Sequence, residues 1–218
     1  MIDQKNKYIT IIGAGCSGLS LCMNLVKNKY KNISLIDPIV NFSKNNHIWG
    51  FWKTNYLDDA IKISSKNWEF WKFENKNKCI ILKSNKFPYY AIYSKDWLEY
   101  CFSKSKKSIN IIKSKFSKKK HFKTRSLYFD SRTPRVKSNT FLQHFYGIEI
   151  HTNKSVFNPQ IATLMDFRVD QTKGIHFINI IPFTKNRALV TSTMFSNKIK
   201  KKNWYLQQIK YYLSRNFK

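Results

Sequence analysis

The sequence predicts an α/β protein in which a parallel sheet near the N-terminus is joined to a mixed or antiparallel sheet in the second half. A β-branched apolar run, Tyr8–Ile12, precedes a glycine-rich turn, Gly13–Gly18, and a segment with helical spacing, Leu19–Val26. A second apolar run, Ile33–Ile36, reads as the next parallel strand. Alternating strand patterns then recur at 141–150, 162–170, 176–181 and 188–195.

The glycine-rich turn has the G-x-G-x-x-G spacing of a dinucleotide-binding loop. Gly13 permits the tight turn, Gly15 lets the backbone approach a pyrophosphate, and Gly18 lets the helix lie close to the strand. Asp37 follows the second strand, 37 − 18 = 19 residues after the last glycine, where an acid would bind a ribose hydroxyl. We predict a cofactor site that includes these four residues and Ser17, at the N-terminus of the helix. The alternative is a tight turn that binds nothing.

Length and composition limit the class of protein. The 218 residues can form one large domain or two small ones, and 42% hydrophobic with 16% aromatic residues exclude a disordered chain. The four cysteines lack C-x-x-C spacing, so we expect reduced, buried thiols and no metal site. We expect no signal peptide, and the longest apolar stretch, 175–183, is too short and too often interrupted to span a bilayer.

The net charge of +28 raises the question of a nucleic-acid partner. Its distribution argues against one, because lysines are scattered through the chain and only six of the 40 basic residues are arginine. The densest basic segment, Lys113–Lys123, is interrupted by aromatic residues as in a surface hairpin. We therefore predict no nucleic-acid function. A more modest interpretation of the positive charge is that it attracts the chain to anionic membrane surfaces.

The remaining elements are predicted from shorter patterns. Residues 93–103 have helical spacing, with Ser94 as the expected N-cap, and 203–217 read as a lysine-rich amphipathic helix. Residues 109–112 and 126–129 read as strands. No Gly/Ser or Pro linker divides the chain.

Several motifs resemble those of one family. They are Asn46–Trp52, Asp130–Arg132, Gln143–Glu149, Met165–Phe167, Asp170–Gln171 and Arg187–Val190. In these motifs, over roughly Tyr8–Asn197, the chain resembles the bacterial, FAD-dependent lycopene β-cyclases. The resemblance implies a flavin monooxygenase-like fold, in which an FAD/NAD(P)-binding Rossmann-like parallel sheet is interleaved with an antiparallel-sheet substrate domain. The implied boundaries are 1–45 and 90–135 for an incomplete FAD-binding domain, 46–89 and 136–200 for the substrate domain, and 201–218 for a terminal helix.

The resemblance also implies a reaction. Lycopene cyclases close the linear ends of lycopene into β-ionone rings, through γ-carotene to β-carotene, in carotenoid biosynthesis. The isomerisation has no net redox change but needs reduced FAD, with NAD(P)H as the source of electrons. The substrate is a polyene hydrocarbon, so the pocket must be apolar and the acid must stay protonated by burial. We expect a cytoplasmic protein, peripheral at the inner face of the membrane.

The implied catalytic residues depart from the family pattern. Directly after Leu189–Val190, where family members resemble one another in having a glutamate, this chain has Thr191. A hydroxyl cannot protonate an alkene at a useful rate. We predict Asp166 as the surviving acid, with Asp170 facing the same side of an alternating strand. The alternative is that Asp166 is a structural carboxylate bonded to the backbone or to Arg168.

Other residues complete the expected site. The predicted substrate-binding residues are Trp49, Phe51, Trp52 and Phe167. The alternative for the tryptophan-rich cluster is ordinary core packing. Arg132, after Asp130, is expected to contact the flavin or its pyrophosphate, as in related flavoproteins, and Glu149 to balance a nearby lysine.

Length is the second departure. Family members continue well beyond residue 218 through a Pro-Thr-Thr-Gly-Tyr-Ser type of motif, so we expect a C-terminally truncated chain, roughly the first half to three-fifths of a cyclase. Such a fragment would retain flavin weakly. The alternative functions are another FAD-dependent monooxygenase or isoprenoid reductase of the same fold, or an inactive cyclase fragment.

Overall fold

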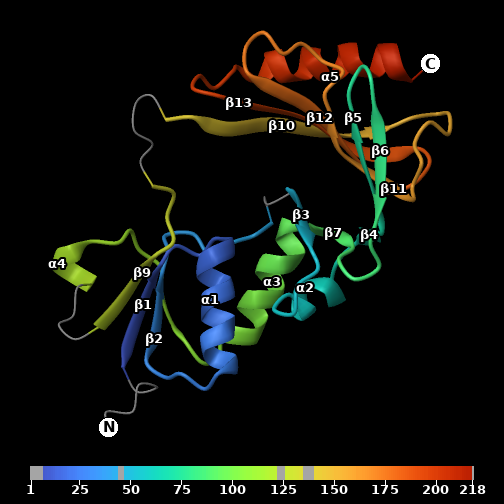
Figure 1. Ribbon diagram of the computed structural model, residues 1–218. Helices are drawn as coiled ribbons and strands as arrows, with labels where there is room; N and C mark the ends of the chain where they lie inside the picture. Colours follow the sequence, from blue (N-terminus) through green and yellow to red (C-terminus); the bar gives the residue numbers. More distant parts are fainter. Residues whose placement is uncertain (1–6, 44–46, 122–125, 135–139, 218) are drawn as a thin grey trace. The chain divides into compact units, whose positions relative to one another are not determined.

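The computed structural model shows a mixed α/β chain (Figure 1). It describes residues 7–43, 47–121, 126–134 and 140–217. The chain divides into two compact units, Met1–Trp49 with Ile92–Arg135, and Gly50–Ala91 with Val136–Lys218. Each unit is therefore assembled from two separate stretches of sequence. The functional assignment of the two predicted domains stays a prediction.

The first unit is built on a four-stranded parallel sheet with strand order β8-β2-β1-β9. Its strands are β1 (Tyr8–Ile12), β2 (Ile33–Ile36), β8 (Asn110–Ile112) and β9 (Ser126–Asp130). The helices of this unit are α1 (Cys16–Lys27), α3 (Ser94–Ser105) and α4 (Lys118–His121). The parallel strand–turn–helix arrangement predicted from the sequence is confirmed. The basic segment expected as a hairpin instead contains the short helix α4.

Helices α1 and α3 pack against each other (Figure 1). Leu19 and Cys22 of α1 are fully buried, and the Trp97 indole of α3 donates a hydrogen bond to Ser20 Oγ at 2.9 Å. Ser94 does not cap α3 as expected, because it is the first helical residue and its Oγ accepts a hydrogen bond from the His47 backbone at 3.1 Å. Two of the four cysteines, Cys16 and Cys79, are exposed, so the expectation of four buried thiols is wrong.

The second unit contains a six-stranded sheet with order β10-β13-β12-β11-β5-β6. Its strands are β5 (Phe70–Glu74), β6 (Cys79–Lys83), β10 (Leu142–His151), β11 (Ile161–Asp166), β12 (Ile175–Pro182) and β13 (Arg187–Ser196). All neighbours are antiparallel except β5 and β11, which run parallel. The predicted mixed sheet is confirmed, but β11 ends at Asp166 rather than at residue 170.

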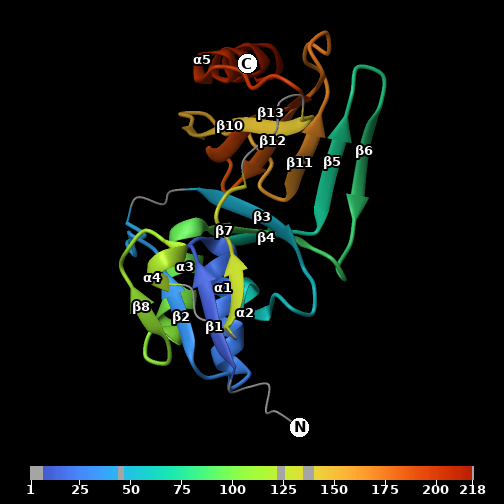
Figure 2. The same ribbon diagram turned by 90° about the vertical axis from the view of Figure 1, so that its left-hand side faces the viewer.

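Helix α5 (Lys202–Asn216) covers one face of the six-stranded sheet (Figures 1 and 2). Ile209 and Tyr212 pack there with Ile178 and Val190 in a buried cluster. Because side chains alternate along a strand, Thr191 and its neighbours two residues away point to the opposite side of the sheet, which we call the far face. The far face also carries residues paired in register with these positions, namely Phe145, Gly147, Glu149, Phe177 and Asn179.

The structure also contains a three-stranded sheet with strand order β3-β7-β4. Its strands are β3 (Ile48–Trp52), β4 (Lys66–Trp68) and β7 (Tyr89–Tyr93), and the short helix α2 is Asp58–Lys62. Among all described helices, none combines the length and the apolar character that crossing a bilayer would demand.

Two histidines are buried between the six-stranded sheet and α5. His176 Nε2 lies 2.9 Å from Ser192 Oγ, and His144 Nδ1 lies 2.6 Å from the hydroxyl of Tyr205 in α5. Burial lowers the pKa of both imidazoles, and the positive charge of Lys200 lowers that of His144 further. Both rings are therefore neutral where α5 packs on the sheet.

We expect acidification to destabilise this packing. The unfolded chain binds a proton at each histidine near pH 6.5, whereas the folded chain binds it only at lower pH, so stability falls as pH drops below about 6.5. Urea unfolding between pH 7.5 and 5.5 measures the slope. His176→Gln should reduce that slope, because it removes one of the two buried imidazoles. An unchanged slope in the His176 variant would contradict the conclusion that the buried His176 ring is neutral in the folded chain.

Candidate functional site

The glycine-rich turn between β1 and α1 is shaped for close approach. Gly13 has φ +102°, a left-handed conformation that favours glycine. A Cβ at Gly18 would lie 2.0 Å from the carbonyl oxygen of Gly13, so only glycine lets the helix lie this close to the turn. A Cβ at Gly15 would meet nothing within 4 Å. The three glycines therefore have the three geometric properties that their spacing predicts.

Asp37 and Ser131 hold the turn from two sides. The Asp37 carboxylate accepts hydrogen bonds from the backbone N–H groups of Ala14 and Ile39, each at 2.8 Å. Ser131 Oγ lies 2.8 Å from the carbonyl oxygen of Ile12 and 2.9 Å from that of Gly13. The sequence analysis missed Ser131, although it lies inside the Asp130–Arg132 motif. Its role depends on β9 lying beside β1, which the sequence does not reveal.

Arg132 lies at the same edge of the parallel sheet, just after β9. Its guanidinium makes two hydrogen bonds to the Asp130 carboxylate, at 2.8 and 2.7 Å, and lies 5.6 Å from the ring centre of Phe116. Its Cγ would be 3.5 Å from a Cβ placed on Gly13. The structure thus brings Arg132 beside the turn, with half of its side chain exposed.

These residues fit a dinucleotide such as FAD. Among the described residues, no side chain caps the N-terminus of α1, and the first turn of this helix contains no acidic residue. The backbone N–H groups there can bind phosphate oxygens, assisted by the helix dipole. Gly15 leaves room for a pyrophosphate, and the Asp37 carboxylate lies next to the turn, where it accepts the hydrogen bond from Ala14. The binding of a ribose by Asp37 stays a prediction. Ser17, in the same first turn, is exposed.

A pair of glycine variants separates packing from ligand binding. Gly18→Ala must move the Gly13 carbonyl, so we expect it to destabilise the first unit by about 2 kcal/mol and to abolish flavin retention. Gly15→Ala should fold normally and lose flavin affinity alone. Thermal unfolding and the fluorescence of released flavin measure the two effects. Normal flavin retention in Gly15→Ala would contradict a pyrophosphate at this position.

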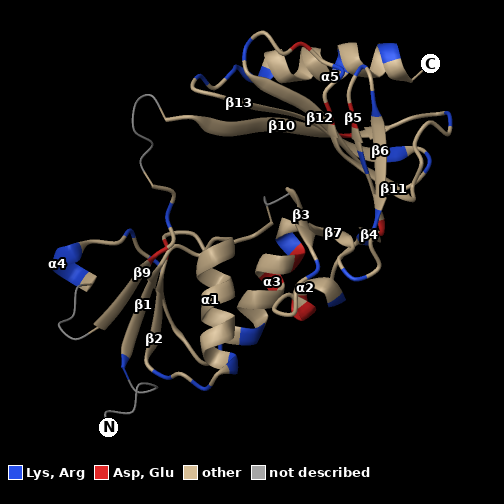
Figure 3. Ribbon diagram, in the orientation of Figure 1, with Lys and Arg blue, Asp and Glu red and all other residues tan. Residues whose placement is uncertain are grey.

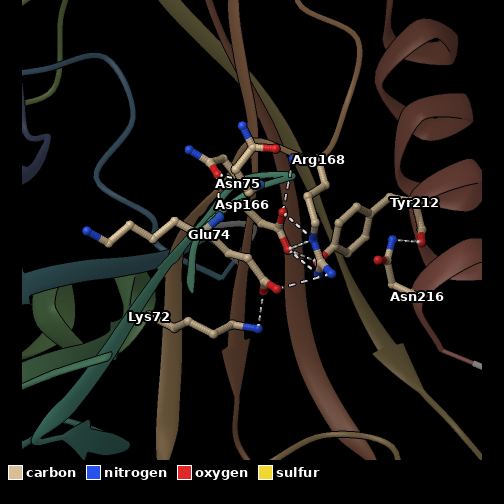
Figure 4. Close-up of polar contacts among 9 residues, drawn as sticks. Lys72, Glu74, Asn75, Asp166, Arg168, Tyr212 and Asn216 are labelled. Carbon is tan, nitrogen blue, oxygen red and sulfur yellow. Dashed lines mark hydrogen bonds and ion pairs between the residues drawn. The ribbon is translucent and has the colours of Figure 1, made fainter. Parts of the chain in front are cut away.

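The second unit contains a chain of charged and polar groups between the sheet and α5 (Figure 4). Asp166 is completely buried and accepts hydrogen bonds from the Arg168 guanidinium and from the Tyr212 hydroxyl of α5. Arg168 also lies 3.2 Å from Glu74, which in turn accepts a hydrogen bond from Lys72 at 2.7 Å. This network joins β5, β11 and α5.

The electrostatics of Asp166 keep it ionised. Burial by itself raises the pKa of this carboxyl, but the hydrogen bonds from Arg168 and Tyr212 and the charge of Arg168 lower it below its usual value. The pKa of Tyr212 is raised, first by burial and then by the same carboxylate. The bond to Arg168 that the sequence analysis gave as the alternative is present. The catalytic role of Asp166 stays a prediction, and the geometry favours the structural role.

Asp170 has different surroundings from Asp166. It lies beyond the end of β11, is exposed, and accepts hydrogen bonds from the Thr172 backbone at 3.0 Å and hydroxyl at 2.8 Å. These bonds lower its pKa. The expectation that Asp166 and Asp170 share one side of a strand is therefore wrong, because the strand does not reach residue 170. The catalytic role of Asp170 also stays a prediction.

Thr191 lies on the far face of the six-stranded sheet. It is paired with Gly147 of β10 and Asn179 of β12, and a Cβ on Gly147 would lie 2.6 Å from Thr191 Oγ1. Glu149 is two residues from Gly147 and therefore points to the same face. Among the three acidic residues in the described strands of this sheet, Glu74, Glu149 and Asp166, only Glu149 lies on the far face.

Glu149 is partnered by Arg187, 3.6 Å away, and by His151, also at 3.6 Å. The structure pairs Glu149 with Arg187 and His151 and not with the expected lysine. Sequence reasoning gave Glu149 no catalytic role, although its position in the Gln143–Glu149 motif was a signal.

The predicted substrate-binding aromatics lie in separate places. Phe51 stacks on Tyr90 with ring centres 5.7 Å apart, whereas Trp52, on the other side of β3, is 39% exposed. Trp49 is half-buried in the same strand, so this cluster is not fully buried core. Phe167 contacts Phe177 of the far face, with ring centres 5.5 Å apart.

Residues 9–216 match the family described as lycopene cyclase protein. The chain belongs to the lycopene cyclase family. The resemblance seen in the sequence motifs is thereby confirmed over almost the whole chain, and membership of the lycopene cyclase family implies an enzyme. No curated protein sequence matches the chain.

Solved structures support the predicted fold of this lycopene cyclase family member. A 2-methyl-3-hydroxypyridine-5-carboxylic acid oxygenase aligns with a TM-score of 0.62 at 12% identity, over 97% of this chain and 66% of that chain. A geranylgeranyl bacteriochlorophyll reductase-like protein from Thermoplasma acidophilum gives 0.60 at 14%, over 96% and 61%. A flavin-dependent brominase gives 0.62 at 10%, over 96% and 61%. The likeness confirms the fold class, and this chain spans less than two thirds of those proteins.

Proposed function

We propose that this protein is a flavin-dependent lycopene cyclase that closes the linear ends of lycopene into β-ionone rings. The observation that carries the proposal is the family match over residues 9–216. It is supported by the glycine turn, whose shape suits a pyrophosphate, and by the resemblance of the fold to that of a flavin-dependent enzyme. We place the protein at the inner face of the membrane, where its substrate dissolves.

FAD is the proposed cofactor, with NAD(P)H as the proposed source of electrons. Gly13, Gly15 and Gly18 with the first turn of α1 would hold the pyrophosphate, and Asp37 would bind the ribose. When bound in its reduced form, the flavin supplies negative charge that stabilises a nearby cation. Arg132 would steady the anionic cofactor from the end of β9.

The far face of the six-stranded sheet is the proposed surface for the reacting end of the polyene. Phe177 lies between Phe167 and Phe195, with ring centres 5.5 and 6.2 Å away. Aromatic faces stabilise a carbocation through their quadrupoles, and a hydrocarbon substrate has no groups that form hydrogen bonds. Asp166 does not suit this role, because it points toward α5 and its pKa is lowered.

We assign the proton transfer to Glu149. Protonation of the terminal double bond creates a cation, attack by a neighbouring double bond closes the ring, and the carboxylate takes back the proton that is lost, so atoms and charge balance. Glu149 is exposed to solvent and pairs with Arg187 at 3.6 Å, so it is not enclosed with the alkene, and we expect slow turnover. Thr191, beside it on the same face, marks where the family glutamate would stand.

Expression in bacteria that accumulate lycopene tests the proposal. The carotenoids are extracted, separated by chromatography and identified by their absorption spectra. We expect γ- or β-carotene with the native chain and unchanged lycopene with Glu149→Gln. Unchanged lycopene with the native, folded chain would refute cyclisation. A saturated or oxygenated product without a ring would instead favour a reductase or monooxygenase.

A further inference from the structure

The second unit carries an apolar groove beside strand β5. It has a volume of about 560 Å³, and its aromatic lining consists of Trp52, Tyr56, Trp71 and Phe87. Tyr56 is 96% exposed and Phe87 49% exposed. The rings of Trp52 and Trp71 meet edge to face with centres 4.2 Å apart, which fixes the wall of the groove. Exposed aromatic surface of this extent marks an interaction site.

The apolar surface continues from the groove onto the edge strand β6. Trp71 pairs with Leu82 and Phe73 with Ile80, so these side chains share one side of the β5–β6 hairpin. Leu82 is 47% exposed and Ile80 is 40% exposed. We call the groove together with Leu82 and Ile80 the aromatic patch. A soluble protein rarely leaves an apolar edge strand of this kind uncovered.

Lysines lie within and beside the aromatic patch. Lys53 lines the groove, and the ammonium group of Lys86 is 5.3 Å from the ring centre of Phe87. Figure 3 shows basic residues on the turns at both ends of the β5–β6 hairpin. Lysine beside tryptophan, tyrosine and phenylalanine is the combination that sits at the headgroup level of a bilayer, with rings in the apolar boundary and ammonium groups at the phosphates.

We propose that the aromatic patch docks the protein on an anionic lipid bilayer. The occupant follows from charge complementarity, because the chain carries a net charge of +28 and the lysines of the patch face the same way as its rings. A second copy would bring lysines against lysines. The inference extends the proposed function, since a polyene must be taken from a membrane, but bilayer binding is measured without flavin or polyene.

Vesicle flotation tests the patch. The purified chain is mixed with phosphatidylcholine vesicles that contain or lack phosphatidylglycerol, and the bound fraction is measured. We expect binding only with phosphatidylglycerol, and at least about tenfold weaker partitioning for Phe87→Ser/Lys86→Glu. The matched control is Ile199→Ser/Lys210→Glu, which makes the same change in charge and also replaces an exposed apolar side chain with serine, at positions away from the patch. It should bind within about twofold of the native chain.

The outcomes separate the possibilities. Equal loss in both double variants would show that net charge, not this surface, drives binding, and would overturn the proposal. Absence of vesicle binding by the native chain would also overturn it. Self-association of the native chain in sedimentation, removed by the patch variant, would assign the surface to a second copy. The vesicles contain no carotenoid, so a failure to bind them would not refute cyclisation. The carotenoid assay tests cyclisation separately.

Discussion

Asp166→Asn is expected to lower the free energy of unfolding by about 2 to 3 kcal/mol. The change removes a buried negative charge that pairs with Arg168 at 2.6 Å and also accepts the Tyr212 hydroxyl hydrogen bond. Arg168 keeps Glu74 as a partner, which limits the loss. Urea unfolding at pH 7 measures the difference. The matched control is Asp170→Asn, which should leave the free energy of unfolding nearly unchanged because Asp170 is exposed.

The same variant has a defined pH dependence. Because the folded pKa of Asp166 lies below the unfolded value of about 3.9, its contribution is fully present above about pH 5. The contribution is lost as pH falls through the folded pKa, so the native chain and Asp166→Asn should converge in stability under acid conditions. Unchanged stability of the variant, with loss of cyclised product, would instead make Asp166 the catalytic acid.

Thr191→Glu is expected to raise the yield of cyclised carotenoid at least about tenfold in lycopene-accumulating bacteria. The substitution places a carboxyl on the far face beside Gly147, at the position after Leu189–Val190 where the family has glutamate. At this half-buried position between Gly147 and Asn179, partial removal from water would raise the pKa of that carboxyl and favour the protonated form that transfers a proton to the alkene.

Two variants control this gain. Thr191→Gln has nearly the same shape as the glutamate and should give no increase, because an amide cannot exchange the proton. Ser192→Glu would point toward α5, where Ser192 is completely buried, and should destabilise the protein instead. An equal yield from Thr191→Gln would show that the effect is one of packing rather than acid–base chemistry.

The parts of the fold that the sequence predicted depend on local patterns. The spacing of Gly13, Gly15 and Gly18 determines the turn directly, because φ values and close contacts act within a few residues. The second-half strands from residue 142 onward follow from alternation that spans up to ten residues. The β5–β6 hairpin was missed, since Phe70–Glu74 pairs in parallel with β11, a partner far along the sequence.

The orientation of Asp166 could not be predicted for a specific reason. Thr163 pairs with Ile180 and Asp166 with Ile178, so three steps along β11 match two steps along β12. This bulge inserts one residue and reverses which face the following side chain occupies. Simple alternation from Thr163 would put Asp166 on the far face, whereas the bulge turns it to Arg168 and Tyr212.

Each unit is made from two stretches of chain, and this arrangement fixes the order in which the protein can be built on a ribosome. Strand β5 leaves the ribosome long before β11, its parallel neighbour, is synthesised. Until β11 is made, the β5–β6 hairpin, with its exposed isoleucines and leucine, has no strand paired to the outer edge of β5. Strand β1 likewise has no β9 beside it until later in synthesis. Nascent chains in this interval are the species that chaperones would need to protect. For the same reason, no single cut in the gene yields either unit intact.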